Sequence, residues 1–164
     1  MTENVWKLEE GEVRKPGIVH VVMLALFTGI GIVVGTFGSL AIPIGFVSAF
    51  WPGQAVQSIG SIWFGWWGAI ASGLFPMISN SLSGSAPLPV SFAYLPGNLL
   101  QGLVAGWAFR KFNAHPSLPT SKDWGVFILW GAIIPNAIGA AWGTTMLVSF
   151  GLITQAAQFV SFLG

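Results

Sequence analysis

The chain contains no cysteine and few charged residues, and both absences limit its chemistry. Without cysteine it cannot form disulfides, thiolate nucleophiles or Cys-based metal sites. Asp, Glu, Lys and Arg make up 7% of the 164 residues, whereas a typical soluble domain has roughly 25%. The net charge of +1 argues against a nucleic-acid partner. Together with 54% hydrophobic residues, this composition predicts an integral membrane protein.

The charged residues lie in two short stretches, 3–15 and 110–123. Residues 16–109 and 124–164 contain no Asp, Glu, Lys or Arg. Because a charge at the bilayer centre costs on the order of 3 kcal/mol, such long uncharged stretches are expected in lipid. They also leave the membrane region without a general acid–base pair or a proton relay of the usual kind. We therefore predict a protein that is not an enzyme and that uses no cofactor or metal.

Apolar runs separated by Gly and Pro predict an all-α integral membrane fold, a bundle of five to six transmembrane helices. One transmembrane domain is expected over 18–164, after a tail at 1–17. A break is expected at Gly65–Gly68 and a kink at Pro135, because Gly and Pro interrupt helices. The expected helices cover 18–37, 52–64, 68–82, 92–112 and a segment from 124 into the 140s.

The C-terminal part leaves two alternatives open. In the first, the apolar stretch 152–164 is a truncated last helix, too short to cross a bilayer. In the second, the fifth helix ends near Gly143, so that the sequence after residue 124 makes two spans of about 20 residues each. The second alternative places the C-terminus on the inner side.

The basic residues indicate an orientation, because Lys and Arg collect on the cytoplasmic side of membrane proteins. If the tail at 1–17 is cytoplasmic, four crossings before residue 110 return the chain to the inside. The loop at about 110–123 is then also cytoplasmic, and all six basic residues lie on one side. We therefore predict a multi-pass protein of the cell membrane with a cytoplasmic N-terminus. Its outer half offers only amides, hydroxyls and aromatic rings.

Uncharged polar residues recur at helical spacing, and in lipid they should point inward, where their amides find partners. Gln54 and Gln57 share a face of the second helix, Asn98 and Gln101 are three residues apart on the fourth, and Asn136 lies among small residues on the fifth. Bonding between helices can explain such stripes, but several amides at the outer end favour a pocket for a neutral substrate. The aromatic rings of Trp51 and Tyr94 could stack on a planar ligand or anchor the protein at the membrane interface. The predicted pocket residues are Trp51, Gln54, Gln57, Asn80, Tyr94 and Asn98.

Small residues at four-residue spacing mark places where membrane helices pack closely. Such pairs occur in several of the expected helices, and packing inside the bundle explains most of them. On the first helix a second interpretation is a docking face for a partner membrane protein. The residues predicted for this face are Ala25, Gly29, Gly31 and Gly35.

Several Gly- and Pro-containing segments resemble the substrate-binding (S) components of energy-coupling factor (ECF) transporters. They are Pro52-Gly53, Phe64-Gly65, Trp67-Gly68-Ala69, Leu95-Pro96-Gly97-Asn98, Gln101-Gly102, Gly106 and Arg110-Lys111. The resemblance, which covers residues 18–112, implies a six-helix bundle with inside termini that captures a vitamin or similar micronutrient from the outer face. It also implies a transmembrane coupling protein, docked through small residues of the first helix such as Ala25 and Gly29, and two cytoplasmic ATPases.

The sequence itself contains no phosphate-binding loop, because Gly65-Trp66-Trp67-Gly68 is not followed by Lys and Ser or Thr. Any ATP-driven step must therefore take place on another subunit. The leading hypothesis is a membrane-embedded subunit that binds a small neutral or aromatic substrate for uptake. The alternatives are a non-catalytic accessory or structural subunit of a larger membrane complex and the sensor input domain of a signalling protein. A passive channel is a weaker alternative.

Overall fold

The computed structural model describes residues 17–41, 43–44, 47–48 and 51–163. The described chain is helical apart from an antiparallel pairing of two short strands, β1 (Pro43–Ile44) and β2 (Val47–Ser48). This confirms the all-helical class. The predicted tail at 1–17 lies outside the described residues except for its last residue. The helices are α1 (Ile18–Ala41), α2 (Gly53–Phe64), α3 (Trp66–Ser83), α4 (Leu88–Ala93), α5 (Leu95–Lys111), α6 (Ser121–Val126), the π-helix η1 (Phe127–Ile133), α7 (Ile134–Ser149) and α8 (Gln155–Leu163).

Helices α2 and α3 form a tight antiparallel hairpin around Gly65. This residue has a φ of +56°, a conformation that glycine adopts without the steric penalty of a side chain. Beyond the turn, Gly68 lies against the backbone of Gly60, and a Cβ at position 68 would overlap the Gly60 carbonyl group. The predicted break at Gly65–Gly68 is therefore confirmed, and so is the start of the second helix next to Pro52.

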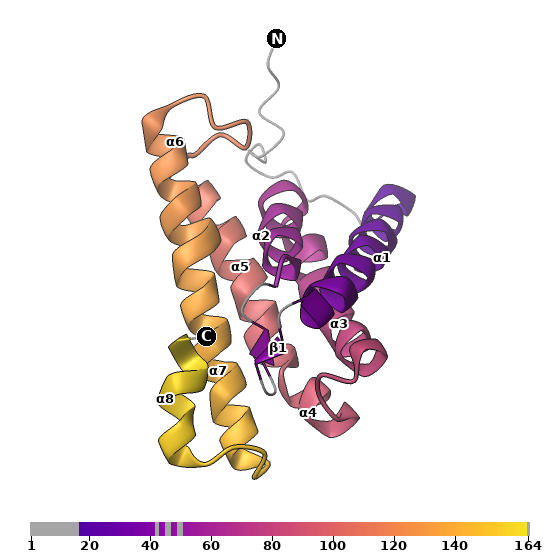
Figure 1. Cartoon of the computed structure of the whole chain (residues 1–164). Helices are drawn as coiled ribbons and strands as arrows, with labels where there is room; N and C mark the ends of the chain where they lie inside the picture. Colours follow the sequence, from indigo (N-terminus) through magenta and orange to yellow (C-terminus); the bar gives the residue numbers. More distant parts are fainter. Residues whose placement is uncertain (1–16, 42, 45–46, 49–50, 164) are drawn as a thin grey trace.

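Helix α1 packs along α3 through two of its glycines. A Cβ at Gly31 would overlap the Phe75 ring, and a Cβ at Gly35 would come within 2.9 Å of the Ser79 hydroxyl oxygen. These two contacts advance in the same direction along both helices, so α1 and α3 are parallel. The longer helices α1, α2, α3, α5 and α7 alternate in direction along the chain (Figure 1). Consecutive loops consequently lie at opposite ends of the bundle.

The fourth predicted helix is two helices in the structure. Helix α4 ends at Ala93 and α5 begins at Leu95, with Tyr94 between them. Pro96 has no N–H, so it cannot donate to the Phe92 carbonyl group four residues earlier. The chain therefore changes direction at a point where the apolar sequence alone predicted a continuous helix.

The fifth predicted helix runs without interruption from Ser121 to Ser149 as α6, η1 and α7. It begins before the predicted start near Trp124, because Thr120 and Asp123 form a capping box at its N-terminus. Around Pro135 the sequence predicted a kink. Next to this proline the structure has the π-helix η1, which ends at Ile133 and shifts the backbone hydrogen-bond pattern within a helix that continues.

The C-terminal segment resolves the two alternatives that the sequence left open. Helix α7 reaches Ser149, and Gly151, with a φ of +70°, follows its end. The alternative in which the fifth helix ends near Gly143 is therefore wrong. Helix α8 has nine residues, about 14 Å of helix, and packs back against α7 (Figure 1). It is too short to cross a bilayer.

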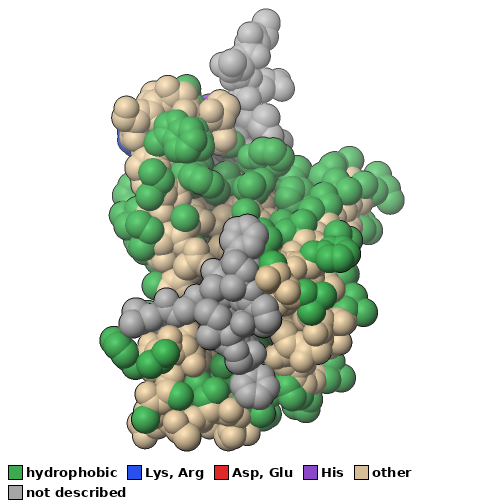
Figure 2. All heavy atoms as spheres, in the orientation of Figure 1, with side chains coloured by type: hydrophobic (Ala, Val, Ile, Leu, Met, Phe, Trp, Pro, Cys, Tyr) green, Lys and Arg blue, Asp and Glu red, His purple; other side chains and the backbone are tan. Residues whose placement is uncertain are grey.

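Large apolar side chains cover much of the exposed surface (Figure 2). On α1 alone, Ile18, Val33 and Phe37 are 76%, 56% and 71% exposed. Two helical segments, Ile18–Ala41 and Ser121–Ser149, are long and apolar enough to cross a membrane. Among the described residues, Asp, Glu, Lys and Arg are confined to the end of α5 and the start of α6: Arg110, Lys111, Lys122 and Asp123.

Candidate functional site: a neutral cavity

A cavity of about 700 Å³ lies among α1, α3, α5, α7 and α8. It is formed by the end of α1, Trp51 ahead of α2, the end of α3, the start of α5, most of the length of α7 and the end of α8. Arg110 and Lys111 lie at the opposite end of α5, the end of the bundle at which Figure 1 shows α6. The cavity and the described charged residues are therefore at opposite ends of the bundle. Its polar and aromatic lining consists of Ser39, Trp51, Asn80, Ser83, Ser85, Tyr94, Asn98, Gln101, Asn136, Trp142, Thr144, Ser161 and Phe162.

Four of the six predicted pocket residues line this cavity: Trp51, Asn80, Tyr94 and Asn98. The other two, Gln54 and Gln57, are buried as predicted, at 7% and 0% exposure, but they lie behind the cavity lining. Nε2 of Gln54 bonds the Ser58 hydroxyl and Nε2 of Gln57 bonds the Ser72 backbone oxygen. Gln54 and Gln57 are therefore supporting residues in this structure.

A chain of hydrogen bonds runs from the η1 backbone to the cavity. Pro135 has no N–H for the Gly131 carbonyl oxygen four residues earlier, and the Ser58 hydroxyl donates to that oxygen at 2.5 Å. The Ser58 oxygen accepts from Nε2 of Gln54 at 3.1 Å. Oε1 of Gln54 in turn accepts from Nε2 of Gln101 at 2.5 Å. This chain fixes the Gln101 side chain at the cavity wall.

A second chain begins at the backbone of α3. The Ser72 carbonyl oxygen accepts from Nε2 of Gln57 at 3.1 Å, and Oδ1 of Asn98 accepts from the same nitrogen at 3.4 Å. The Ser72 hydroxyl lies 2.8 Å from the Gly68 carbonyl oxygen and 3.2 Å from the Gln57 carbonyl oxygen, and its single proton is shared between these two acceptors. Oε1 of Gln57 is buried without a partner among the described residues. Asn98 is thereby held with its oxygen turned toward α2.

Two tryptophans form aromatic walls. Nε1 of Trp142 donates to the Ala93 carbonyl oxygen at 2.8 Å, and its ring lies on Gly97, where a Cβ would come within 2.6 Å of it. The Trp51 ring stacks on Phe75 with 5.9 Å between ring centroids and 25° between planes. Since the N–H of Trp142 is already used, this ring can offer only its apolar surface to a ligand.

The pocket prediction omitted Gln101, Asn136 and Trp142, although the stripe analysis placed the first two on inward faces. Asn136 donates from Nδ2 to the Ala132 carbonyl oxygen at 2.9 Å, which leaves its oxygen and its second N–H for a ligand. The signals that could have identified these residues are the three-residue spacing of Asn98 and Gln101 and the small residues that follow Asn136. Nothing in the sequence pattern distinguishes Trp142 from an interface anchor.

The predicted docking residues of α1 fall on two different faces. Ala25 and Gly29 are exposed, and a Cβ at Gly29 would meet nothing within 4 Å. Gly31 and Gly35 are buried against α3. Only the first two residues are therefore available to a partner, and the second two belong to packing inside the bundle.

The described residues that line the cavity include no Asp, Glu, Lys, Arg, His or Cys. The part of the chain that the structure describes also contains no group of three His, Cys, Asp or Glu side chains able to hold a metal. The lining can donate and accept hydrogen bonds and can stack on a planar group. No protein-family model matches the chain, and no curated protein or solved structure shows significant similarity to it.

Proposed function

We propose that the protein is the membrane-embedded substrate-binding subunit of an uptake transporter for a small neutral micronutrient, and that separate ATPase subunits supply the energy. The observation that carries the proposal is the neutral cavity, at the end of the bundle opposite the described charged residues. By the positive-inside rule, the charged end is cytoplasmic and the cavity opens outward. A volume of about 700 Å³ lies within the range of pockets that hold small molecules and cofactors.

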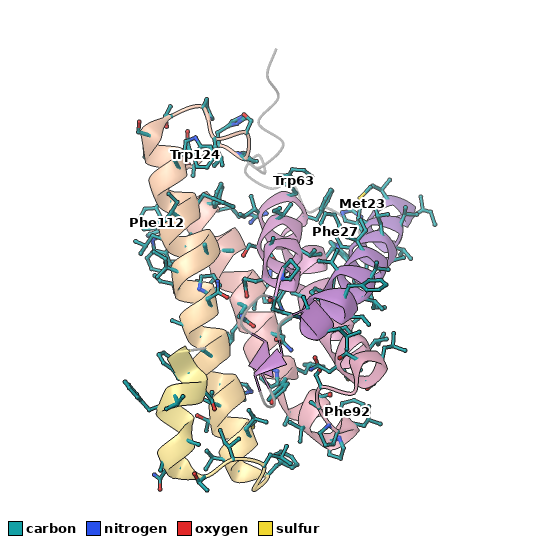
Figure 3. The ribbon with its side chains drawn as sticks, viewed as in Figure 1. Met23, Phe27, Trp63, Phe92, Phe112 and Trp124 are labelled. Carbon is teal, nitrogen blue, oxygen red and sulfur yellow. The ribbon has the colours of Figure 1, made fainter. Side chains whose placement is uncertain are left out.

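The exposed surface supports the membrane part of the proposal. Helices with large apolar side chains outward would be poorly solvated in water, and lipid removes that penalty. Exposed aromatic residues occur toward both ends of the bundle, as they do at the two interfaces of a membrane. Figure 3 shows Trp124 near the charged end and Phe92 near the other, and these side chains are 51% and 54% exposed.

The exposed face of α1 supports the need for a partner. Ala25 and Gly29 lie side by side one turn apart, which allows another helix to approach the backbone closely. We propose this face as the contact with a transmembrane coupling protein. An accessory structural subunit is the alternative function that the same face favours, and it would bind partners without a small molecule.

Native mass spectrometry of the gently purified protein tests the proposal, because it reads bound small molecules and bound subunits together. We expect a small neutral molecule to be retained by the wild-type protein and lost from Asn98→Leu, while Ser81→Ala, an exposed position outside the cavity, retains it. Gly29→Leu should lose partner subunits and keep the small molecule. Partner subunits without any small molecule would instead support the accessory role.

A further inference from the structure

One of the two hydrogen-bond chains leaves an acceptor at the cavity, and the other leaves a donor. A backbone carbonyl oxygen can only accept a hydrogen bond, so it fixes the direction of every bond that follows from it. Because the Ser58 hydroxyl donates to the Gly131 oxygen, Ser58 must accept from the amide nitrogen of Gln54. The oxygen of Gln54 is then left to accept from the nitrogen of Gln101. These directions assign the oxygen and nitrogen of each amide from the network itself.

The first chain leaves a free acceptor at the cavity. Gln101 is 4% exposed and lines the cavity, and its Nε2 is already committed to Gln54. Its Oε1 has no partner among the residues that the structure describes. Because Gln101 lines the cavity, this oxygen is an acceptor that a ligand in the cavity can use.

The second chain leaves a free donor. Nε2 of Gln57 must point at the Ser72 carbonyl oxygen, since the reversed amide would place two oxygens against each other. The same nitrogen therefore meets the oxygen of Asn98, and Nδ2 of Asn98 remains for the cavity. Asn98 and Gln101 are three residues apart on α5, so both side chains lie on one face of the helix.

We propose that the cavity recognises a neutral planar ligand with an N–H and a C=O on one edge, as in a lactam, a cyclic imide or a carboxamide. Gln101 accepts from the N–H of the ligand and Asn98 donates to its C=O, while Trp51 and Trp142 supply apolar walls. Both amides are held in advance by the chains behind them, which lowers the entropy lost on binding. This inference rests on the proposed function and specifies the chemical class of its substrate.

Three bicyclic compounds of similar size test the two assignments separately. Indolin-2-one has both groups, 1-methylindolin-2-one lacks the N–H, and indole lacks the C=O. We expect calorimetric titration of the detergent-purified protein to give indolin-2-one at least about tenfold higher affinity than either of the others, because each loses one bond to a buried amide. Equal affinities of the three compounds for the wild-type protein would overturn the inference without any variant.

Two variants assign each preference to its residue. Gln101→Leu should remove the preference for indolin-2-one over the methylated compound, and Asn98→Leu should remove the preference over indole. Ser81→Ala, an exposed position outside the cavity, should keep both preferences. The ratio of affinities is the readout, so a general loss of stability does not imitate the result. Preferences that survive in both variants would overturn the assignment.

The identity of a co-purified ligand separates this inference from the proposed function. A retained small molecule that lacks either the N–H or the C=O would overturn the inference and leave the proposed function standing. If no small molecule is retained and none of the three compounds binds, both this inference and the proposed function are wrong. A retained molecule with an amide-like edge, lost from Gln101→Leu, would support both.

Discussion

The hydroxyl oxygen of Ser58 lies 2.5 Å from the carbonyl oxygen of Gly131 and donates a hydrogen bond to it across the contact between α2 and η1. The bond compensates for Pro135, which cannot supply the N–H that a regular helix would place there. A proline in one helix is therefore matched by a serine in another. The same serine accepts from Gln54, so the pairing also sets the direction of the amide chain behind the cavity.

Replacing Ser58 should show how much this pairing stabilises the fold. In Ser58→Ala the Gly131 oxygen and the Gln54 amide both lose a partner, and we expect the free energy of unfolding to fall by about 1–2 kcal/mol. Equilibrium unfolding in detergent measures the change. Ser81→Ala is the matched control, because the exposed Ser81 hydroxyl bonds only its own helix at Met77. An equal effect at both positions would contradict the prediction.

The contact of α1 with α3 should respond to a single methyl group. In Gly31→Ala the new Cβ overlaps the Phe75 ring, and such overpacking costs about 1–3 kcal/mol. Gly29→Ala, two residues away, meets nothing within 4 Å and should be neutral or stabilising by up to about 1 kcal/mol, because alanine favours helix more than glycine. Thermal unfolding of both variants measures the difference. Opposite results would mean that α1 packs on α3 by its other face.

Two glycines of α7 test the position of Gln101. A Cβ at Gly139 would overlap the Gln101 amide, whereas a Cβ at Gly143, which also lines the cavity, would meet nothing within 4 Å. We expect Gly139→Ala to weaken ligand binding about 10- to 100-fold by displacing the amide. Gly143→Ala should bind within about threefold of wild type unless the ligand itself occupies that space. Titration with the co-purified ligand, or with indolin-2-one, gives the comparison.

Ligand affinity should depend little on pH or salt. The described lining has no side chain whose ordinary pKa lies between 5 and 8, and its one tyrosine ordinarily titrates near 10. Titrations at pH 5, 6.5 and 8, and in about 0.05 and 0.5 M NaCl, should therefore agree within about threefold for a neutral ligand. A steep change with pH would show that an ionisable group takes part in binding.

The lack of cysteine makes the proposed orientation directly measurable. Ser117 lies in the loop at the charged end, and Gln155 begins α8 at the other end; both are exposed. In intact cells a membrane-impermeant maleimide should label Gln155→Cys and should label Ser117→Cys only after permeabilisation. The cysteine-free wild-type protein supplies the background. Labelling of both positions from outside would refute the proposed topology.

Local chemistry allowed the sequence to predict where several helices begin and end. Pro52 and Gly65 delimit α2 as expected, since proline suits the first turn and glycine the turn at the end. At Tyr94 the structure has a break that the sequence did not predict. At Pro135 the π-helix η1 is followed by α7, and Ser58 on another helix bonds the carbonyl oxygen that the proline cannot reach. Such compensation depends on tertiary contacts, which a pattern along one chain does not contain.

The sequence predicted the candidate site only in part, as it did the ends of the helices. Helical periodicity correctly predicted that Gln54 and Gln57 point inward, because residues at helical spacing share one face. It could not distinguish an amide that lines a cavity from one that supports the lining, since both point the same way. That distinction depends on which partners are within reach. Gln101 became part of the lining because Gly139, on another helix, leaves room for its side chain.

The confinement of the described charges to one end has an energetic consequence for the proposed transport. Moving one elementary charge across a membrane with a potential of 100 mV changes its free energy by about 2.3 kcal/mol. Neither the described residues of the cavity lining nor a neutral ligand carries a charge for this potential to act on. Capture and release would then be electroneutral, so a resting potential would neither concentrate the nutrient nor expel it. The subunit would rely entirely on the work done by its partners.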